Sequence, residues 1–517
     1  MAQAVAAGPP PAPPAAQRAG IAVLVVALAG GALALNRALV GVFYDDGLYA
    51  GLAVALSHGQ GYVHPHLPGT PAAVHYPPLY PLVLAPLFGT LPVTAAAFAA
   101  KLLNLLLAAL GAGLIAWHAV RTNLLGDGAP RWLAPALVGA SALAIPVLAV
   151  QSVLFAEPLF GVLLAAAVIL ADLAPAPGQD RPSSTVSAGL AGLAAALALL
   201  TRSIGVAAGM GVVLFLLLVR RAPWKRALVA ASPVFVAGLG WGLWVLRHRG
   251  GIDPAMSINY GSYVEPVKQA GFGIFGRAAR DLPRPLGDLA LGWLPVPWLY
   301  YLFGAAALVV GIVGLARLLR RSAIGFTLIF YLAILAVWPF SADRFLWAVL
   351  PWLALTWAGG VVSLWSRRRL RLPLVVLVLV VGFGYAQLEE RGFAGRWWGT
   401  MAHRISGNFT GLLPWVATLP PSAVLATDDE ALVWLYARRT TVPFYVYGYR
   451  GRALTQPTPA EHRAYLERQG VTHILLPGPG SGSDEEIDAL LGAYPGWLTL
   501  VHGWSHGRVV FAVNRGR

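Results

Sequence analysis

Long apolar segments, separated by short polar ones, run through most of this 517-residue chain. A segment of about 17 to 25 apolar residues can cross a bilayer as a helix. Only 11% of the residues are charged and the mean hydropathy is +0.66, which a soluble globular fold with a solvated surface does not reach. The chain is therefore predicted to be an α-helical polytopic membrane protein. About eleven transmembrane helices are expected, near residues 20–43, 93–120, 132–150, 153–174, 186–201, 203–219, 226–246, 297–316, 323–338, 344–363 and 372–388.

The first 19 residues form a Pro- and Ala-rich tail in which Arg18 is the only basic residue. Because a secretory signal carries a basic region at this place, the next apolar run is predicted to be an uncleaved first helix behind a disordered cytoplasmic tail. The chain has no cysteine, so a metal ion would have to bind carboxylates, histidines or carbonyls.

The net charge of +15 comes from arginines that fall between the apolar segments. Three basic clusters stand where the positive-inside rule expects cytoplasmic loops, at 220–226, 317–321 and 367–371. This pattern argues against a nucleic-acid partner and predicts a multi-pass protein of the cell (inner) membrane with a cytoplasmic N-terminus. The features that then share the external side are the loops 44–92 and 247–295 and the residues Glu157, Arg202, Asp343 and Arg344.

Residues 389–517 have the composition of a soluble α/β domain, predicted to lie outside the cytoplasm and to cover the external face or hold a substrate. Strand-like runs lie at 423–426 and 472–476, and Gly470 is predicted to end the helix before the second run. Capping boxes predict three helix starts, at Thr427 with Glu430, Thr458 with Glu461 and Ser483 with Glu486. The acidic cluster 428–430 is accordingly interpreted as a helix N-terminus rather than a metal site.

The loop 44–92 carries the densest polar signal. It begins with the adjacent carboxylates Asp45 and Asp46, and apolar residues then recur at helical spacing up to the glycines at 59 and 61, which predicts an amphipathic helix lying on the bilayer. Four histidines follow, but their irregular spacing matches no compact metal site. His64 and His66 are predicted to belong to a polar surface loop, whereas the roles of His58 and His75 stay open.

Five motifs in this order resemble the GT-C glycosyltransferases of the family 39 type, which include protein O-mannosyltransferases and the lipid A aminoarabinose transferase. The motifs are Asp45-Asp46-Gly47-Leu48-Tyr49-Ala50, His75-Tyr76-Pro77-Pro78-Leu79-Tyr80-Pro81, Phe155-Ala156-Glu157-Pro158-Leu159, Leu200-Thr201-Arg202-Ser203 and Asp343-Arg344-Phe345-Leu346. The likeness covers most of residues 20–390. No single motif is highly specific. The resemblance rests on the order of the five motifs and on their predicted position on the same side of the membrane.

The resemblance implies an inverting glycosyltransferase that moves a sugar from a polyprenyl-phosphate carrier to an extracytoplasmic glycan, lipid or protein. Such a displacement needs a carboxylate to accept the acceptor's proton and cations to receive the leaving phosphate. By the resemblance Asp45 is the general base, with Asp46 and Glu157 as further catalytic candidates. The alternative is that Asp45 or Asp46 caps the helix that follows.

Glu157 has two interpretations. By the resemblance it helps to hold a divalent metal or the acceptor; alternatively it forms a buried pair with an arginine such as Arg202. A divalent metal ion is the one cofactor left open, with Asp46 and Glu157 as its candidate ligands. Arg202 and Arg344 are predicted to grip the carrier phosphate, because a guanidinium can bind two oxygens at once, unless they merely extend to the membrane interface.

One departure weakens any transfer of the aminoarabinose enzymes' substrate to this chain. Those enzymes carry a lysine in the segment that here reads Tyr76-Pro77-Pro78, where it would contact the carrier phosphate. In this chain His75 or an arginine would have to contact the carrier phosphate instead. The predicted substrate-binding residues are Arg202, Arg344, His75, Tyr76, Tyr80 and His58.

Two further functional classes remain as alternatives, a lipid-linked sugar flippase or transporter without transferase chemistry, and a scaffold. A flippase predicts a charged path through the bilayer, whereas the charged groups here are predicted to stop at one interface. The loop 247–295, with Asn259, Tyr260 and Tyr263, is predicted to be either a lid that orders over a glycan or an ordinary connector.

Overall fold

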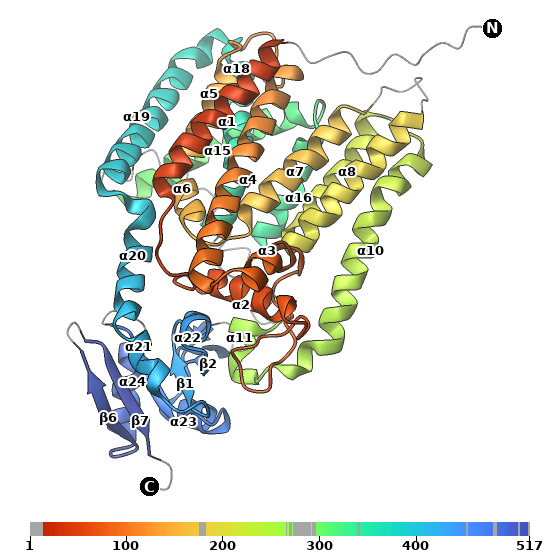
Figure 1. Ribbon diagram of the computed structural model, residues 1–517. Coiled ribbons are helices and arrows are strands. Elements are labelled where there is room, and N and C mark those ends of the chain that lie inside the picture. The colour runs from red at the N-terminus through yellow and green to blue at the C-terminus, as the bar shows by residue number, and fades with distance from the viewer. Residues whose placement is uncertain are drawn as a thin grey trace.

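The computed structural model describes residues 14–174, 182–264, 266–267, 271, 291, 296–338, 342–450, 453–478, 483–504 and 507–514. A bundle of long helices forms one part of the molecule, and a small α/β domain lies at one end of it, opposite the end where the chain begins (Figure 1). Two short helices, α2 (Asp45–Ser57) and α3 (Leu79–Thr90), lie between the two parts.

The bundle is built from helices whose bounds follow the predicted apolar segments. They are α1 (Pro14–Ala34), α4 (Val93–Arg121), α5 (Leu133–Leu143), α6 (Ile145–Ser152), α7 (Glu157–Asp172), α8 (Pro182–Thr201), α9 (Val206–Leu214), α10 (Trp224–His248), α15 (Pro297–Leu318), α16 (Ala323–Ala336), α18 (Leu350–Trp365) and α19 (Arg371–Gly395). Within the described ranges, six helices are long and apolar enough to cross a membrane, or seven if the bent pair α5 and α6 is one span. The prediction of a membrane-spanning helical bundle agrees with this finding, while the number of eleven stays a prediction.

Small residues allow some helix pairs to approach closely. Gly314 of α15 faces the backbone of α18, and a Cβ atom at this position would lie 1.8 Å from the carbonyl oxygen of Thr356. Gly360 of α18 meets α15 in the same way, 2.0 Å from the carbonyl oxygen of Val310. Without a hydrophobic driving force in lipid, such close backbone packing holds membrane helices together.

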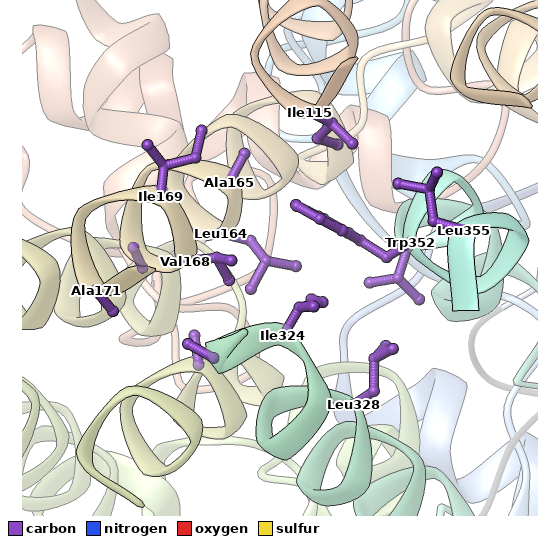
Figure 2. Packing of buried hydrophobic residues seen from close by; sticks show 14 of the residues in the cluster. Ile115, Leu164, Ala165, Val168, Ile169, Ala171, Ile324, Leu328, Trp352 and Leu355 are labelled. Carbon is purple, nitrogen blue, oxygen red and sulfur yellow. The ribbon is translucent and has the colours of Figure 1, made fainter. Parts of the chain in front are cut away.

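The centre of the bundle is filled by apolar side chains from several helices. Trp352 of α18 projects among Ile115 of α4, Leu164 of α7 and Leu328 of α16 (Figure 2). Trp352, Leu164 and Leu328 are each 1% exposed, so their side chains are closely packed in this layer.

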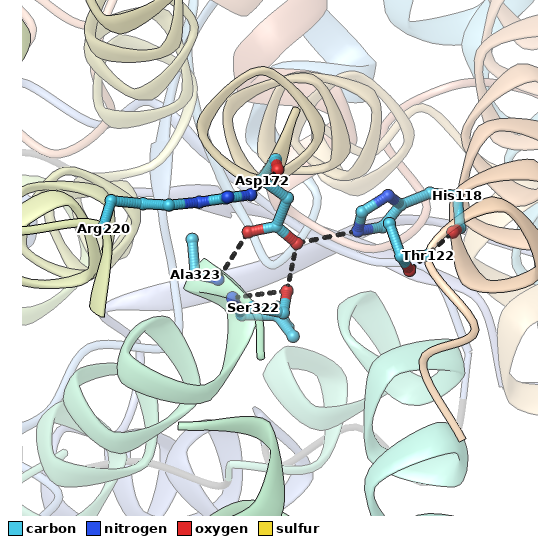
Figure 3. A network of polar contacts seen from close by, with 7 residues as sticks. His118, Thr122, Asp172, Arg220, Ser322 and Ala323 are labelled. Atoms are coloured by element: carbon cyan, nitrogen blue, oxygen red, sulfur yellow. Dashed lines mark hydrogen bonds and ion pairs between the residues drawn. The ribbon is translucent and has the colours of Figure 1, made fainter. Parts of the chain in front are cut away.

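A buried polar network ties four helices together at the end of the bundle away from the α/β domain. The carboxylate of Asp172, the last residue of α7, accepts hydrogen bonds from the Ala323 backbone N–H at 2.7 Å and from the Ser322 hydroxyl (Figure 3). The Nε2 atom of His118 on α4 lies 2.9 Å from the same carboxylate. Arg220 donates to the backbone carbonyl of Asp172, so this α7 end is fully bound by its neighbours.

Helix α2 corrects one expectation. It was predicted to lie on the bilayer as an amphipathic helix, but its residues from Asp46 to Ala55 are all buried. The helix packs against α3 on one side and against α22 (Glu430–Ala437) of the α/β domain on the other. Gly47 is in close contact there, since a Cβ atom would lie 2.9 Å from the Ala431 side chain. The buried surface of α2 is therefore shared between protein layers rather than with lipid.

The α/β domain follows α19 and the linking helices α20 (Trp397–Thr410) and α21 (Leu413–Thr418). Its five-stranded sheet has the order β2-β1-β5-β7-β6, in which β1 (Val424–Thr427) pairs in parallel with β2 (Thr440–Pro443) and β5 (His473–Leu476). The strands β6 (Leu498–Gly503) and β7 (Val509–Val513) add an antiparallel edge. A separate hairpin joins β3 (Gly448–Arg450) to β4 (Ala453–Thr455).

The helix ends of this domain were predicted with mixed success. The capping box of Thr458 and Glu461 is present at the start of α23 (Pro459–Arg468), and Gly470 follows that helix with a φ of 71°. The predicted capping box at Thr427 is wrong, because Thr427 is the last residue of β1 and α22 begins only at Glu430. Ser483 begins α24 (Ser483–Ala493), and its hydroxyl donates to Asp428.

Candidate active site

A cavity of about 620 Å³ lies where the bundle meets the α/β domain. Its bundle wall comes from the start of α2, the segment before α3, and α17 (Asp343–Ala348). The facing wall comes from α11 (Ser257–Tyr260) and from the α/β domain, through Asp428, Tyr445 and Tyr447. The cavity thus lies between segments that are far apart in the sequence.

Asp45, the first residue of α2, lines this cavity. The Tyr76 hydroxyl donates to its Oδ1 atom at 2.5 Å, and Arg344 forms an ion pair with its Oδ2 atom. Burial acts to raise the pKa of Asp45, but the Arg344 guanidinium and the Tyr76 hydroxyl outweigh it and hold this pKa below its ordinary value. Asp45 is therefore an ionised acceptor with two hydrogen-bond partners and access to the cavity.

Arg344 connects Asp45 to a second carboxylate. Its Nε atom lies 2.9 Å from Oε1 of Glu157, the first residue of α7, and Arg202 pairs with the same oxygen from the other side. The Arg344 guanidinium also lies 4.5 Å from the centre of the Phe155 ring. The four side chains form an alternating row in which only Asp45 and Arg344 reach the cavity, while Glu157 and Arg202 lie behind them.

This row bears on the second of the two interpretations of Glu157. The buried pair with Arg202, which the sequence left as the alternative, is present, and Arg344 adds a second cation. A buried carboxylate is costly unless it is paired, and both arginines form ion pairs with its Oε1 atom here. Glu157 thus holds the two guanidinium groups in place.

His75 and Tyr76 belong to the same cavity. The Nδ1 atom of His75 donates to the Gly261 carbonyl at 2.7 Å, and its ring lies 4.2 Å from the Tyr263 ring. Burial lowers the pKa of His75 below its ordinary value, which favours a neutral imidazole. His75 thereby fixes the segment of Tyr263 across the cavity from Asp45.

Three predicted site residues lie away from the cavity. Asp46 is fully buried and its two oxygens accept the backbone N–H groups of Gly41 and Phe43 at 2.8 and 2.9 Å, so it shapes the turn before α2. Burial, opposed by these hydrogen bonds, raises the pKa of Asp46 to about 6. Tyr80 is also fully buried, with its hydroxyl donating to Asn104, and His58 lies exposed at the far end of α2. The geometry gives none of the three a place beside a substrate in this cavity.

His64 and His66 also correct the sequence analysis. They were assigned to a polar surface loop, but they are 0% and 1% exposed and their rings pack against Tyr260. The Nε2 atom of His66 lies 2.8 Å from the Tyr260 hydroxyl, which donates to Glu430. Burial lowers the pKa of His66 to about 3, so these residues form a neutral interface between the loop and the α/β domain.

Residues of the α/β domain line the cavity, although no sequence pattern indicated which ones. The acidic cluster 428–430 does stand at a helix N-terminus, since Asp429 directly precedes α22 and Glu430 begins it, and Asp428 also lines the cavity together with Tyr445 and Tyr447. Only the Asn259–Tyr263 segment gave a signal, as part of a possible lid. Asn259 and Tyr263 do line the cavity, whereas much of the loop 247–295 lies outside the described residues.

The two candidate metal ligands already have partners. The oxygens of Asp46 accept backbone N–H groups, and the Oε1 atom of Glu157 pairs with two guanidinium groups. A cation at Asp46 would have to displace these donors, whereas the Oε2 atom of Glu157 has no hydrogen-bond partner among the described residues. Across the described residues, no group of three histidine, aspartate or glutamate side chains is arranged to hold a metal ion.

An apolar cavity of about 80 Å³ adjoins the charged row on its bundle side. Glu157 and Trp347 lie at its lining together with Leu107 and Val147, which come from α4 and α6. Because Trp347 borders both cavities, an apolar region of the bundle lies directly beside the site of Asp45 and Arg344.

No family model and no curated protein matches the sequence. The structure is similar to the crystal structure of ArnT from Cupriavidus metallidurans in the apo state, with a TM-score of 0.53, 16% identity, and 95% of this chain and 97% of that chain covered. It is also similar to the oligosaccharyltransferase AglB from Archaeoglobus fulgidus in complex with an inhibitory peptide and a dolichol-phosphate, with a TM-score of 0.51, 12% identity, and 88% and 69% covered. The fold implied by the sequence resemblance is thus found over nearly the whole chain, and the protein has the GT-C glycosyltransferase fold.

Proposed function

We propose that this protein is an inverting glycosyltransferase that moves a sugar from a polyprenyl-phosphate carrier to an extracytoplasmic acceptor, with Asp45 as general base. The observation that carries the proposal is the pairing of Asp45 with Arg344 at the cavity wall. A carboxylate that accepts a proton and a guanidinium that receives a phosphate are the two groups that this reaction requires. They stand side by side here.

In the proposed reaction the acceptor hydroxyl attacks the anomeric carbon from the side opposite the phosphate. The hydroxyl proton passes to Asp45 as the new C–O bond forms, which inverts the anomeric centre. The bond between the anomeric carbon and the phosphate oxygen breaks, and its electron pair stays on the polyprenyl phosphate. Arg344, supported by Glu157 and Phe155, is the group that receives this charge.

Arg344 has a further part in the proposal, because it pairs with Asp45 in the ligand-free protein. A guanidinium that turns toward the donor phosphate weakens its contact with Asp45. Loss of that contact raises the pKa of Asp45 and makes it a better proton acceptor. The base would thus strengthen when the donor binds.

The surroundings of the site support a lipid-linked donor. The apolar cavity beside Glu157 offers a place for the first isoprene units of a carrier whose phosphate meets Arg344. The AglB structure of the same fold contains a dolichol-phosphate, a lipid carrier of this chemical class. The closely packed apolar layer around Trp352 favours a transferase over a flippase, which would need a polar path through it.

The topology is part of the same proposal. The N-terminus would lie in the cytoplasm and the α/β domain outside, with the protein in the cell (inner) membrane. Basic residues at the bundle end away from the cavity support this orientation, since Arg220 binds the Asp172 carbonyl and Arg321 the Asn123 carbonyl there. The number of eleven spans belongs to this proposal too, whereas the predicted domain limits at residues 19 and 389 both fall inside helices, α1 and α19.

The test is complementation of a strain that lacks the protein. Mass spectrometry should detect a lipid-linked sugar that accumulates in the deletion strain and identify the donor. The wild-type protein should remove this species, whereas Asp45→Asn should not. Asp343→Asn is the matched control, because it replaces a neighbouring carboxylate of the same cavity. A protein with this substitution should still clear the accumulated lipid-linked sugar. Full complementation by Asp45→Asn would exclude Asp45 as the base.

A further inference from the structure

Two chemically different sets of residues line the cavity. Asp45 and Arg344 are the charged pair assigned above to the transfer reaction. Asn259, Asp428, Tyr445 and Tyr447 form a second set, which no step of that reaction uses. Three of these four residues belong to the α/β domain, so the cavity is complete only with that domain in place.

Asn259 supplies the strongest sign that this second set of residues binds a ligand. The residue lines the cavity and is only 9% exposed, and its carboxamide oxygen is buried without a hydrogen-bond partner among the described residues. The residue is held in place through its backbone, because its carbonyl accepts the Tyr44 hydroxyl at 3.2 Å. Buried polar atoms normally have partners, so this unpartnered oxygen beside the cavity would gain a hydrogen bond if the side chain turned toward a donor group of a ligand.

The two tyrosines offer a surface with both apolar and polar parts. Their rings are 5.3 Å apart with an interplanar angle of 64°, and both side chains are half-buried. Gln456 donates to the Tyr445 hydroxyl at 3.3 Å, which fixes that ring. A pyranose or furanose ring has apolar C–H faces and hydroxyl groups at its edge. The face of a tyrosine ring can contact the C–H face of the sugar, and the tyrosine hydroxyl can form a hydrogen bond with a sugar hydroxyl.

The charges of the cavity restrict the ligand further. Three carboxylates line it, Asp45, Asp343 and Asp428, whereas Arg344 is the only lysine or arginine among the described lining residues. Arg344 is already paired with Asp45 and Glu157. A phosphorylated or carboxylated acceptor would bring its charge near these carboxylates without a cation of its own, and such like-charge contact excludes ligands.

We propose that Asn259, Asp428, Tyr445 and Tyr447 form the acceptor site, and that the acceptor is an uncharged, hydroxyl-rich glycan. That the bound glycan is the acceptor of the transferred sugar rests on the proposed function. That a glycan binds at these residues does not depend on it. The carboxamide oxygen of Asn259 and the carboxylate of Asp428 accept hydrogen bonds from sugar hydroxyls, while the tyrosine rings contact the sugar faces. A glycan held here would direct a hydroxyl toward Asp45 across the cavity.

The test uses the full-length protein in nanodiscs and two probes, the neutral and the anionic fractions of acid-released envelope oligosaccharides separated by anion exchange. Saturation-transfer NMR should detect binding of the neutral fraction and not of the anionic one. Tyr447→Ala and Asn259→Leu should weaken that binding by about tenfold, whereas Tyr447→Phe, which keeps the ring, should weaken it less. Polyprenyl phosphate binding is measured on each sample and should persist in all three variants.

The outcomes separate this inference from the proposed function. Binding of the anionic fraction in preference to the neutral one, or neutral binding that is unchanged in both Tyr447→Ala and Asn259→Leu, would overturn the acceptor site. Polyprenyl phosphate binding without any glycan signal would overturn it too and leave the transferase proposal standing. Neutral glycan binding that depends on Asn259 and Tyr447, but without polyprenyl phosphate binding, would retain the glycan site and remove the transferase.

Discussion

Helix α7 begins with Glu157 and ends with Asp172, and both carboxylates are buried. Asp172 lies in a closed network, where His118, Ser322 and the Ala323 N–H group bind both of its oxygens. Glu157 lies in a network that is open on one side, because its partner Arg344 also reaches Asp45 and the cavity.

The two ends of α7 differ in whether their polar groups are accessible to a ligand. At the Asp172 end the bonds of the carboxylate join α7 to α4 and α16, which fits a role in holding the bundle together (Figure 3). At the Glu157 end the Arg344 side chain is 27% exposed, so a ligand can reach it. A buried charge by itself is therefore weak evidence of a catalytic site, and access from a cavity is the distinguishing feature.

The largest expected effect is on the closed end. Asp172→Ala should lower the free energy of unfolding by about 3 to 5 kcal/mol, because it leaves His118 and the Ala323 N–H group without their buried partner. Thermal unfolding in detergent measures this change. Asp127→Ala is the control, since Asp127 is exposed and its loss should have little effect. An unfolding temperature of Asp172→Ala equal to that of the parent would show that the network does not stabilise the bundle.

The next effect concerns the open end. Arg344→Ala should weaken binding of polyprenyl phosphate by about 1.5 to 3 kcal/mol, the usual contribution of a hydrogen bond to a charged group. Titration of the lipid into the purified protein measures it. Arg438→Ala removes an exposed arginine of the α/β domain that lies outside the cavity and should not change the affinity. Equal affinities for the parent and Arg344→Ala would separate Arg344 from the donor.

A pH profile sharpens the same contrast. Asp45 must be ionised to accept a proton, so transfer falls as pH drops through its pKa, which Arg344 and Tyr76 keep low against the opposing effect of burial. Arg344→Gln removes the cation, raises this pKa and should move the acidic limb of kcat/KM, which reports the free protein, to higher pH by about one unit. The position of the limb is compared and not the height of the profile, so that weaker binding does not contribute. An unmoved acidic limb would mean that Asp45 is not the titrating group.

Glu430 extends the comparison to a third buried carboxylate and gives the smallest effect. Burial raises its pKa from 4.5 to about 8. A group with a raised folded-state pKa contributes stability that is fully present below its unfolded value and is lost as pH rises through the folded value. The parent should therefore lose stability between pH 4.5 and 8 relative to Glu430→Gln, which thermal unfolding measures as a falling unfolding temperature. Parallel pH profiles for the two proteins would contradict a neutral Glu430.

The sequence predicted the bundle well because apolar segments of spanning length have few alternatives. It also brought Asp45, His75, Tyr76, Glu157, Arg202 and Arg344 into one region, and these residues do meet in the structure. The membrane topology rule and the motif order were sufficient for that grouping.

The errors came from contacts between distant segments. Asp46 and Asp45 are adjacent and identical in type, but a helix start directs one toward the backbone of residues 41 to 43 and the other toward the cavity. The burial of His64, His66 and α2 depends on the α/β domain packing onto the loop, which no local pattern reports. The same packing places Asp428, Tyr445 and Tyr447 in the cavity wall.

The central claim is that one buried network catalyses transfer while the other supports the fold. The direct test compares Asp45→Asn and Asp172→Asn in purified protein, with sugar transfer and thermal unfolding measured on the same samples. Asp45→Asn should lower transfer by about a hundredfold or more and leave the unfolding temperature near that of the parent. Asp172→Asn should lower the unfolding temperature and leave transfer per folded molecule nearly unchanged. Near-parent transfer by Asp45→Asn, or a loss of transfer in Asp172→Asn that its stability does not explain, would contradict the account.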